Sequence, residues 1–159
     1  SSDEAKAIFR AALAAVAGLD IAALMTTGPS MDVAALGEIP ANVTLRGFVP
    51  QTDVFPYVSV VLCHGGSGSV LGTLAASLPL VVTPIGADQP DNAASVAAAG
   101  AGIAVTAPDP DAVAAALQAV LTEPGYGQAA QRIAAEMAGQ SGIDAAVGEM
   151  VALAATDPV

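Results

Sequence analysis

Basic residues are scarce in this sequence. Four Lys and Arg residues stand against fifteen Asp and Glu residues, which gives a formal charge of −11 over 159 residues. This charge repels nucleic-acid phosphates and anionic lipid surfaces, so we expect neither a nucleic acid nor a membrane as a partner. A negatively charged ligand would need local donors, such as the backbone N–H groups at the start of a helix.

Cysteine, histidine and aromatic residues are also rare. One cysteine excludes a disulfide within the chain, and together with one histidine it provides no Cys/His set for a metal. The single cysteine predicts an intracellular, cytoplasmic protein. Tryptophan is absent and aromatic residues make up 3% of the chain, so the core must be built from Ala, Val, Leu and Ile. Such a core is typical of helices layered on parallel strands.

Short apolar runs alternate with helical periodicity along the chain. Gly, Pro and Asn turn signals bound the runs, which predict strands at residues 21–26, 43–49, 58–63, 80–85 and 102–106. Apolar residues at helical spacing predict the buried face of one helix, made by Val70, Leu71, Leu74, Ala75 and Leu78. Asp109 followed by Pro110 predicts a cap and a helix that runs to about Leu121. Two closing helices are expected at residues 126–137 and 143–155.

This alternation predicts the fold class. We expect an α/β fold with a Rossmann-like, doubly wound, mostly parallel sheet, forming one domain over residues 1–159. Domains of this type usually open on a strand, whereas this chain opens on a helix. We therefore expect the first strand to lie upstream of Ser1.

The only histidine and the only cysteine lie in a glycine-rich segment, LCHGGSGSVLGT, at residues 62–73. It follows a predicted strand and opens a predicted helix, where N–H groups and the helix dipole favour an anion. No lysine follows the glycines, which excludes a Walker loop, and Leu71 stands where a dinucleotide fingerprint needs its third glycine. Cys63 and His64 point to opposite faces of a strand, so a Cys-His nucleophile pair is disfavoured and Cys63 is expected in the core. A phosphate site and a simple tight turn both stay open.

Two further blocks flank this loop at fixed offsets. The stretch NVTLRGFVPQTDVFPYVSVVLCHGGSGSVLGTLAASLPLVVTPIGADQPDNA, residues 42–93, resembles the C-terminal, donor-binding domain of GT-B nucleotide-sugar glycosyltransferases, closest to the bacterial enzymes that decorate natural products such as antibiotics. The likeness extends from Asn42 to about Leu121. It implies that the chain is one half of a GT-B fold.

The resemblance implies contacts for each part of a nucleotide-sugar. Phe48 matches an aromatic residue that stacks on the base, and Val49 and Gln51 lie beside the base and ribose. His64 matches a histidine that contacts the diphosphate, which is cradled by Gly66, Ser67, Gly68 and Ser69. Phe48 could instead be a core aromatic at a strand end.

The block after the loop adds the sugar contacts. Asp88 and Gln89 match an acidic-Gln pair that hydrogen-bonds sugar hydroxyls, although a surface turn or helix cap would also explain them. Gly72 departs from the many relatives that carry a glutamate holding ribose hydroxyls. Because thymidine diphosphate (TDP) sugars carry deoxyribose, Gly72 favours a TDP-deoxysugar over a uridine diphosphate (UDP) sugar. Asp109-Pro110-Asp111 spells a metal-binding Asp-x-Asp pattern, but a helix cap is the better interpretation, and we expect neither metal nor cofactor.

The resemblance also implies a reaction, an inverting, metal-independent transfer of a hexosyl group to a hydroxyl of a natural-product acceptor. The general base and acceptor pocket belong to an N-terminal domain, so we expect no catalytic residue in this chain. The chain alone is expected to be inactive and poorly stable, and to depend on that domain in cis or on a partner subunit. Two alternatives stay open: a non-catalytic nucleotide-binding module, and half of a nucleotide-sugar epimerase.

Overall fold

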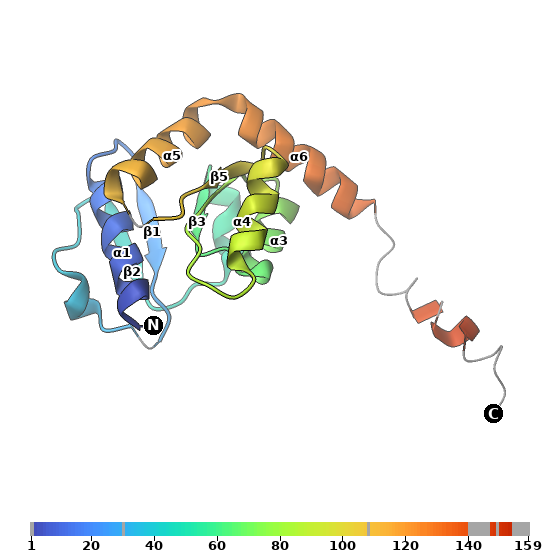
Figure 1. Ribbon diagram of the computed structural model, residues 1–159, viewed down its shortest axis with the longest axis horizontal. Coiled ribbons are helices and arrows are strands. Elements are labelled where there is room, and N and C mark those ends of the chain that lie inside the picture. Colours follow the sequence, from blue (N-terminus) through green and yellow to red (C-terminus); the bar gives the residue numbers. More distant parts are fainter. Residues whose placement is uncertain (1, 30, 108, 140–146, 149, 154–159) are drawn as a thin grey trace.

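The computed structural model describes residues 2–29, 31–107, 109–139, 147–148 and 150–153 (Figure 1). Its helices are α1 (Ser2–Ala17), α2 (Gln51–Val54), α3 (Ser67–Ala75), α4 (Gln89–Ala98), α5 (Pro110–Thr122) and α6 (Pro124–Ala138), with 3-10 turns η1 (Val33–Leu36) and η2 (Phe55–Tyr57). Its strands are β1 (Ala23–Thr26), β2 (Val43–Arg46), β3 (Val61–Cys63), β4 (Leu80–Val82) and β5 (Gly102–Ala104). Strands and helices alternate, which confirms the predicted α/β fold.

The strands of the described residues pair in parallel within two sheets. β1 lies beside β2, and the second sheet has the order β3-β4-β5. In the second sheet Leu80 is the partner of Val61 on one side and of Gly102 on the other. The central strand β4 is buried along its whole length.

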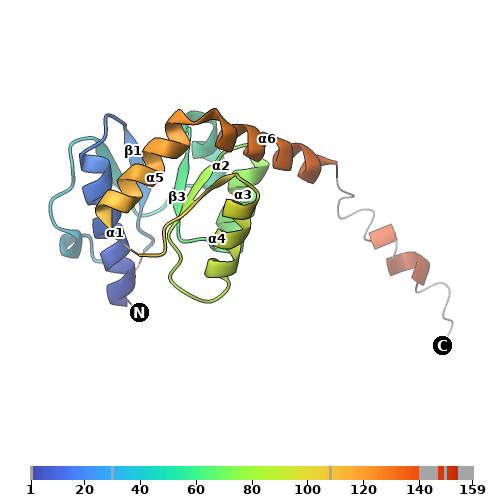
Figure 2. The same cartoon turned by 45° about the horizontal axis from the view of Figure 1, so that its top comes forward.

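Helices cover both faces of β4 (Figure 2). Leu80 and Val82 pack on one face with α3, α4 and α6, in a cluster that includes Val70, Leu74, Ala93, Val96, Ala129 and Ala130. Val81 points the other way, toward α1 and α5, where it meets Ala15, Val16, Val113, Ala116, Leu117 and Val120. Side chains from β1 and β2 pack against this second cluster, so both sheets share one core.

All five paired strands are shorter than their apolar runs. β4 was expected to reach residue 85 but ends at Val82, because Pro84 has no N–H to continue the ladder. The predicted helix stripe was wrong at Leu71 and Ala75, which are exposed, Leu71 by 54%. The buried face of α3 includes Thr73 instead, which is 0% exposed. A pattern of hydrophobic residues could not predict that a threonine is buried on this helix.

The C-terminal helices agree with the sequence as far as they are described. α5 begins at Pro110, and α6 covers the first predicted closing helix. Of the second, expected at residues 143–155, residues 147–148 and 150–153 are helical and the others lie outside the described residues. None of the helices in the described part of the chain is both long and apolar enough to cross a bilayer.

Parallel pairing places the loops that carry the candidate site side by side. β3 and β4 end at the same sheet edge, where the N–H of Thr83 donates to the carbonyl of Cys63 at 2.9 Å. The loop after β3 leads into α3, and the loop after β4 leads into α4. In open α/β sheets this carboxyl edge is where ligands bind.

Candidate functional site

The glycine loop leaves the start of α3 without a side-chain cap. Gly66 occupies the N-cap position in extended backbone, and no side chain accepts a capping hydrogen bond there. The first N–H groups of the helix, from Ser67 onward, therefore face the loop with the positive end of the helix dipole. This arrangement suits an anionic group.

Two glycines in the loop lie at close approaches. Gly65 has φ +91°, and a Cβ added there would lie 2.7 Å from Val82 Cγ1 and 3.2 Å from the carbonyl oxygen of Gln89. A Cβ on Gly66 would lie 2.7 Å from Nε2 of His64. The first glycine thus lets the loop approach α4, and the second lets the imidazole of His64 lie over the start of α3.

Ser67 and Asp88 meet across the two loops, together with Asn92 from α4. The hydroxyl of Ser67 donates to Oδ2 of Asp88 at 2.7 Å, and Nδ2 of Asn92 donates to the same oxygen at 3.0 Å. Asn92 also donates to the carbonyl of Gly65 at 2.9 Å. The predicted diphosphate loop and the predicted sugar-binding residue are therefore joined directly. Asn92 was not among the predicted site residues, although its place four residues after Asp88 puts it one helical turn away.

These bonds lower the pKa of the Asp88 carboxyl, with the Ser67 hydroxyl contributing most, then Asn92, and His64 adding a small effect through its charge. A lowered pKa means that the ionised form persists below the usual carboxyl range and is lost only as the pH falls through the lowered value. Asp88 is exposed, and its hydrogen bonds outweigh the opposing effect of desolvation on the pKa.

Replacing Ser67 with alanine tests this cause. Because the main donor is removed, we expect the pKa of Asp88 to rise toward its ordinary value, so that the carboxylate is lost at a higher pH than in the wild type. Carbon NMR of the labelled Asp88 carboxyl, followed against pH, measures the change. Ser95→Ala is the control, since the Ser95 hydroxyl donates to the carbonyl of Asp91 and not to Asp88. A titration of Asp88 that is the same in both variants would contradict the assignment.

Asp88 and Gln89 differ in how they use their side chains. Asp88 stands at the N-cap of α4, yet its carboxylate makes no capping bond. Oε1 of Gln89 accepts from the N–H groups of Ile85 at 2.8 Å and Gly86 at 3.2 Å, so its carbonyl end stabilises the turn. Ala87, between Gly86 and Asp88, has φ +56°, an uncommon conformation for a residue with a side chain, which the turn holds in place.

The segment after β2 reaches the same loop. Nε2 of Gln51, in the first turn of α2, lies 3.3 Å from Oγ of Ser69 and donates to it. Phe48 is 78% exposed, so it is not the core aromatic that the sequence also allowed. Val49 is half-buried.

Gly72 lies beside Phe55, and a Cβ built on it would meet that ring at 3.8 Å, an ordinary contact distance.

Cys63 packs against the core, and Asp109 caps a helix. Cys63 is half-buried against the core cluster of α3, α4 and α6, and desolvation raises the pKa of its thiol, which disfavours the thiolate that a nucleophile needs. The carboxylate of Asp109 accepts from the N–H of Asp111 at 3.1 Å, which confirms the predicted cap of α5.

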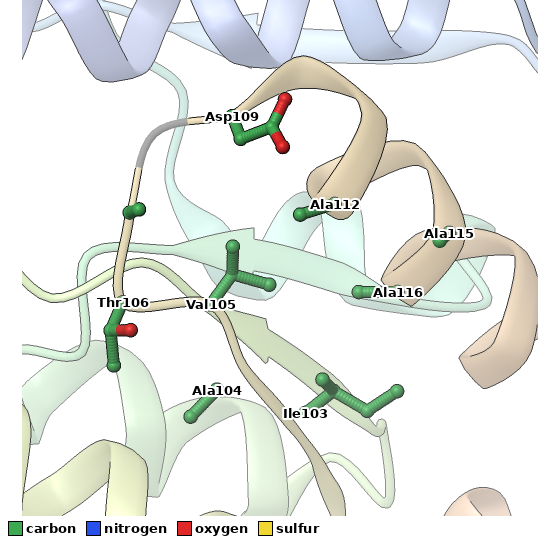
Figure 3. A pocket seen from close by; sticks show the side chains of 9 residues that line it. Ile103, Ala104, Val105, Thr106, Asp109, Ala112, Ala115 and Ala116 are labelled. Atoms are coloured by element: carbon green, nitrogen blue, oxygen red, sulfur yellow. The ribbon is translucent and has the colours of Figure 1, made fainter.

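A hollow of about 560 Å³ lies elsewhere, between the end of β5 and α5 (Figure 3). Its lining is mostly apolar, and the one carboxylate on it belongs to Asp109. It contains none of the predicted site residues. The candidate site is thus an open surface of loops and helix starts and not this hollow.

Comparison with known proteins places the chain in a family. The family described as "Erythromycin biosynthesis protein CIII-like, C-terminal domain" matches residues 10–153. The chain is 39% identical over 121 residues to the elloramycin glycosyltransferase ElmGT of Streptomyces olivaceus, covering 76% of this chain and 30% of that protein. It is 31% identical over 149 residues to 4'-demethylrebeccamycin synthase of Lentzea aerocolonigenes, covering 92% and 34%. The chain therefore spans about a third of these relatives.

Solved structures agree with the sequence relatives. The glycosyltransferase VinC in complex with dTDP superposes with a TM-score of 0.84 at 28% identity, covering 93% of this chain and 38% of that one. The spinosyn rhamnosyltransferase SpnG complexed with thymidine diphosphate superposes with a TM-score of 0.79 at 29% identity, covering 91% and 40%. The chain belongs to the EryCIII-like C-terminal domain family, the nucleotide-sugar donor-binding domain of GT-B natural-product glycosyltransferases.

Proposed function

We propose that this chain binds a TDP-deoxysugar and supplies the donor half of an inverting glycosyltransferase that acts on a hydroxyl of a natural-product acceptor. The observation that carries the proposal is the joining of the uncapped start of α3 to Asp88 through Ser67. Donors for a diphosphate would then lie next to an acceptor for sugar hydroxyls, as a nucleoside diphosphate sugar requires, which supports the proposal.

Each part of the ligand has matching chemistry. The N–H groups of Gly66, Ser67, Gly68 and Ser69, with a ring nitrogen of His64, donate to the diphosphate. The exposed ring of Phe48 stacks on the base, with Val49 and Gln51 beside the nucleoside. The Asp88 carboxylate and the Gln89 amide bind sugar hydroxyls, the amide acting through its nitrogen because its oxygen serves the turn.

The same donors assist the reaction. As the acceptor oxygen attacks the anomeric carbon, the bond to the diphosphate breaks and negative charge grows on the leaving group. Preorganised N–H groups stabilise that charge, and His64 adds a donor, so the proposed step uses no metal ion. The general base that takes the acceptor proton comes from a separate acceptor-binding domain, which is a partner of this chain.

Gly72 favours a deoxyribose nucleotide. No side chain at this position can satisfy a ribose 2′-hydroxyl, and an unpaired hydroxyl costs binding energy. Two structural neighbours of the chain were solved with thymidine diphosphate, which supports the proposal.

Calorimetric titration of the chain with TDP and UDP tests the proposal. We expect TDP to bind about three- to tenfold more tightly, because the 2′-hydroxyl of UDP is left unsatisfied and its base lacks the methyl group of thymine. Gly72→Glu should raise the affinity for UDP relative to TDP, because a Cβ fits beside Phe55 and the carboxylate can accept from the ribose. Gly47→Ala, where an added Cβ meets nothing within 4 Å, is the control. Tighter binding of UDP by the wild type would contradict the TDP assignment, and binding of neither nucleotide would contradict the donor site.

A further inference from the structure

Asn92 makes more contacts across the site than any residue predicted for it. It is half-buried in the first turn of α4, and its Nδ2 lies 2.9 Å from the carbonyl oxygen of Gly65, 3.2 Å from Oγ of Ser67 and 3.0 Å from Oδ2 of Asp88. These acceptors belong to the loop after β3, the first residue of α3 and the loop after β4. One amide group with two hydrogens therefore serves three acceptors on both sides of the site.

The helix does not need this amide. The backbone N–H of Asn92 already donates to the carbonyl of Asp88 at 3.1 Å, as in any helix, while the side chain reaches out of α4 to the other loop. Oδ2 of Asp88 accepts from both Asn92 and Ser67, so the exposed carboxylate has its orientation fixed by the loop it faces. The three side chains close a triangle of hydrogen bonds between the two loops.

We propose that Asn92 is a positioning residue that sets the distance between the diphosphate-binding loop and Asp88. This inference rests on the proposed function. A nucleoside diphosphate uses the segment that holds Phe48, the loop and the start of α3, but not Asp88, whereas a nucleoside diphosphate sugar must also reach Asp88. Loss of the Asn92 amide therefore penalises ligands that span both parts of the site.

The test compares two ligands that differ only in the sugar. Dissociation constants for TDP and for a TDP-6-deoxyhexose are measured by calorimetry on the wild type and on Asn92→Ala. We expect the ratio of the sugar nucleotide's constant to that of TDP to rise about tenfold in the variant, since one bond to a charged group is lost and its partner is freed to rotate. A variant that only loses fold stability would bind both ligands less well in the same proportion and leave the ratio unchanged.

Further variants keep the test decisive. Ser95→Ala removes a side-chain bond within the same helix, to the carbonyl of Asp91, and should leave the ratio at the wild-type value. Asn92→Ser retains a donor at the start of α4 but is too short to reach Gly65 and Asp88 together, so it should show the selective loss even if Asn92→Ala does not fold. An unchanged ratio in a folded Asn92 variant overturns the inference and leaves the donor site standing. Failure of the wild type to bind TDP overturns the proposed function itself.

Discussion

Replacing Gly102 with alanine is expected to lower the free energy of unfolding by about 3 kcal/mol or more. Gly102 lies in β5, directly opposite Leu80 of the central strand. A Cβ added to it would lie 2.1 Å from the carbonyl oxygen of Leu80 and 2.9 Å from Cγ1 of Val96. The nearest atoms belong to backbone and cannot rotate away, so β5 must move from β4 and the buried helix face behind it must shift.

Urea unfolding followed by circular dichroism measures this loss. Gly127→Ala in α6 is the matched control, because an added Cβ there meets nothing within 4 Å. We expect the control to gain up to about 1 kcal/mol, since alanine is favoured over glycine inside a helix. Equal urea midpoints for Gly102→Ala and the wild type would show that the strands can separate at little cost, contrary to the packing described.

The sequence predicts the order of the strands and helices better than the residues at which they begin and end. Alternating apolar runs and caps such as Asp109-Pro110 are local signals, and the structure confirms the strands and helices they indicate. Strand ends depend on which backbone groups find partners, as at Pro84, where the ladder stops although the apolar run continues to Ile85. The burial of Thr73 in place of Leu71 depends on how α3 rotates against α6 and the sheet, which hydrophobicity alone does not encode.

In the candidate site, too, the sequence indicated some features and not others. Glycine spacing after an apolar run indicated the uncapped start of α3, and Gly65 proves to be needed where the loop approaches β4 and α4. The bonds between segments could not be predicted, because residues 18 to 27 positions apart meet only in the folded chain. The parallel pairing of β3 with β4 brings Asn92 to Gly65, and Gln51 reaches Ser69 from the segment after β2. The sequence did not indicate Asn92 for this reason, since its amide reaches the carbonyl of Gly65 only when the two loops lie side by side.

His64→Ala is expected to weaken TDP binding about 10- to 100-fold while leaving the fold intact. The imidazole is exposed and lies over Gly66, close to the N–H groups that open α3. From there a ring nitrogen can donate to the diphosphate, and a hydrogen bond to a charged group contributes about 1.5–3 kcal/mol. Since the described core clusters contain no part of His64, its loss removes ligand contacts and not packing.

Calorimetric titration with TDP measures the effect, and circular dichroism checks the fold of each variant. His64→Gln should retain part of the affinity, because its amide can still donate to a phosphate oxygen from a similar reach. Gln118→Ala, on the exposed side of α5, is the control for a side-chain truncation away from the loop. If His64→Ala binds TDP as tightly as the wild type and the control, the histidine does not contact the diphosphate. The glycine loop would then be explained as a tight turn that lets α3 and α4 approach each other.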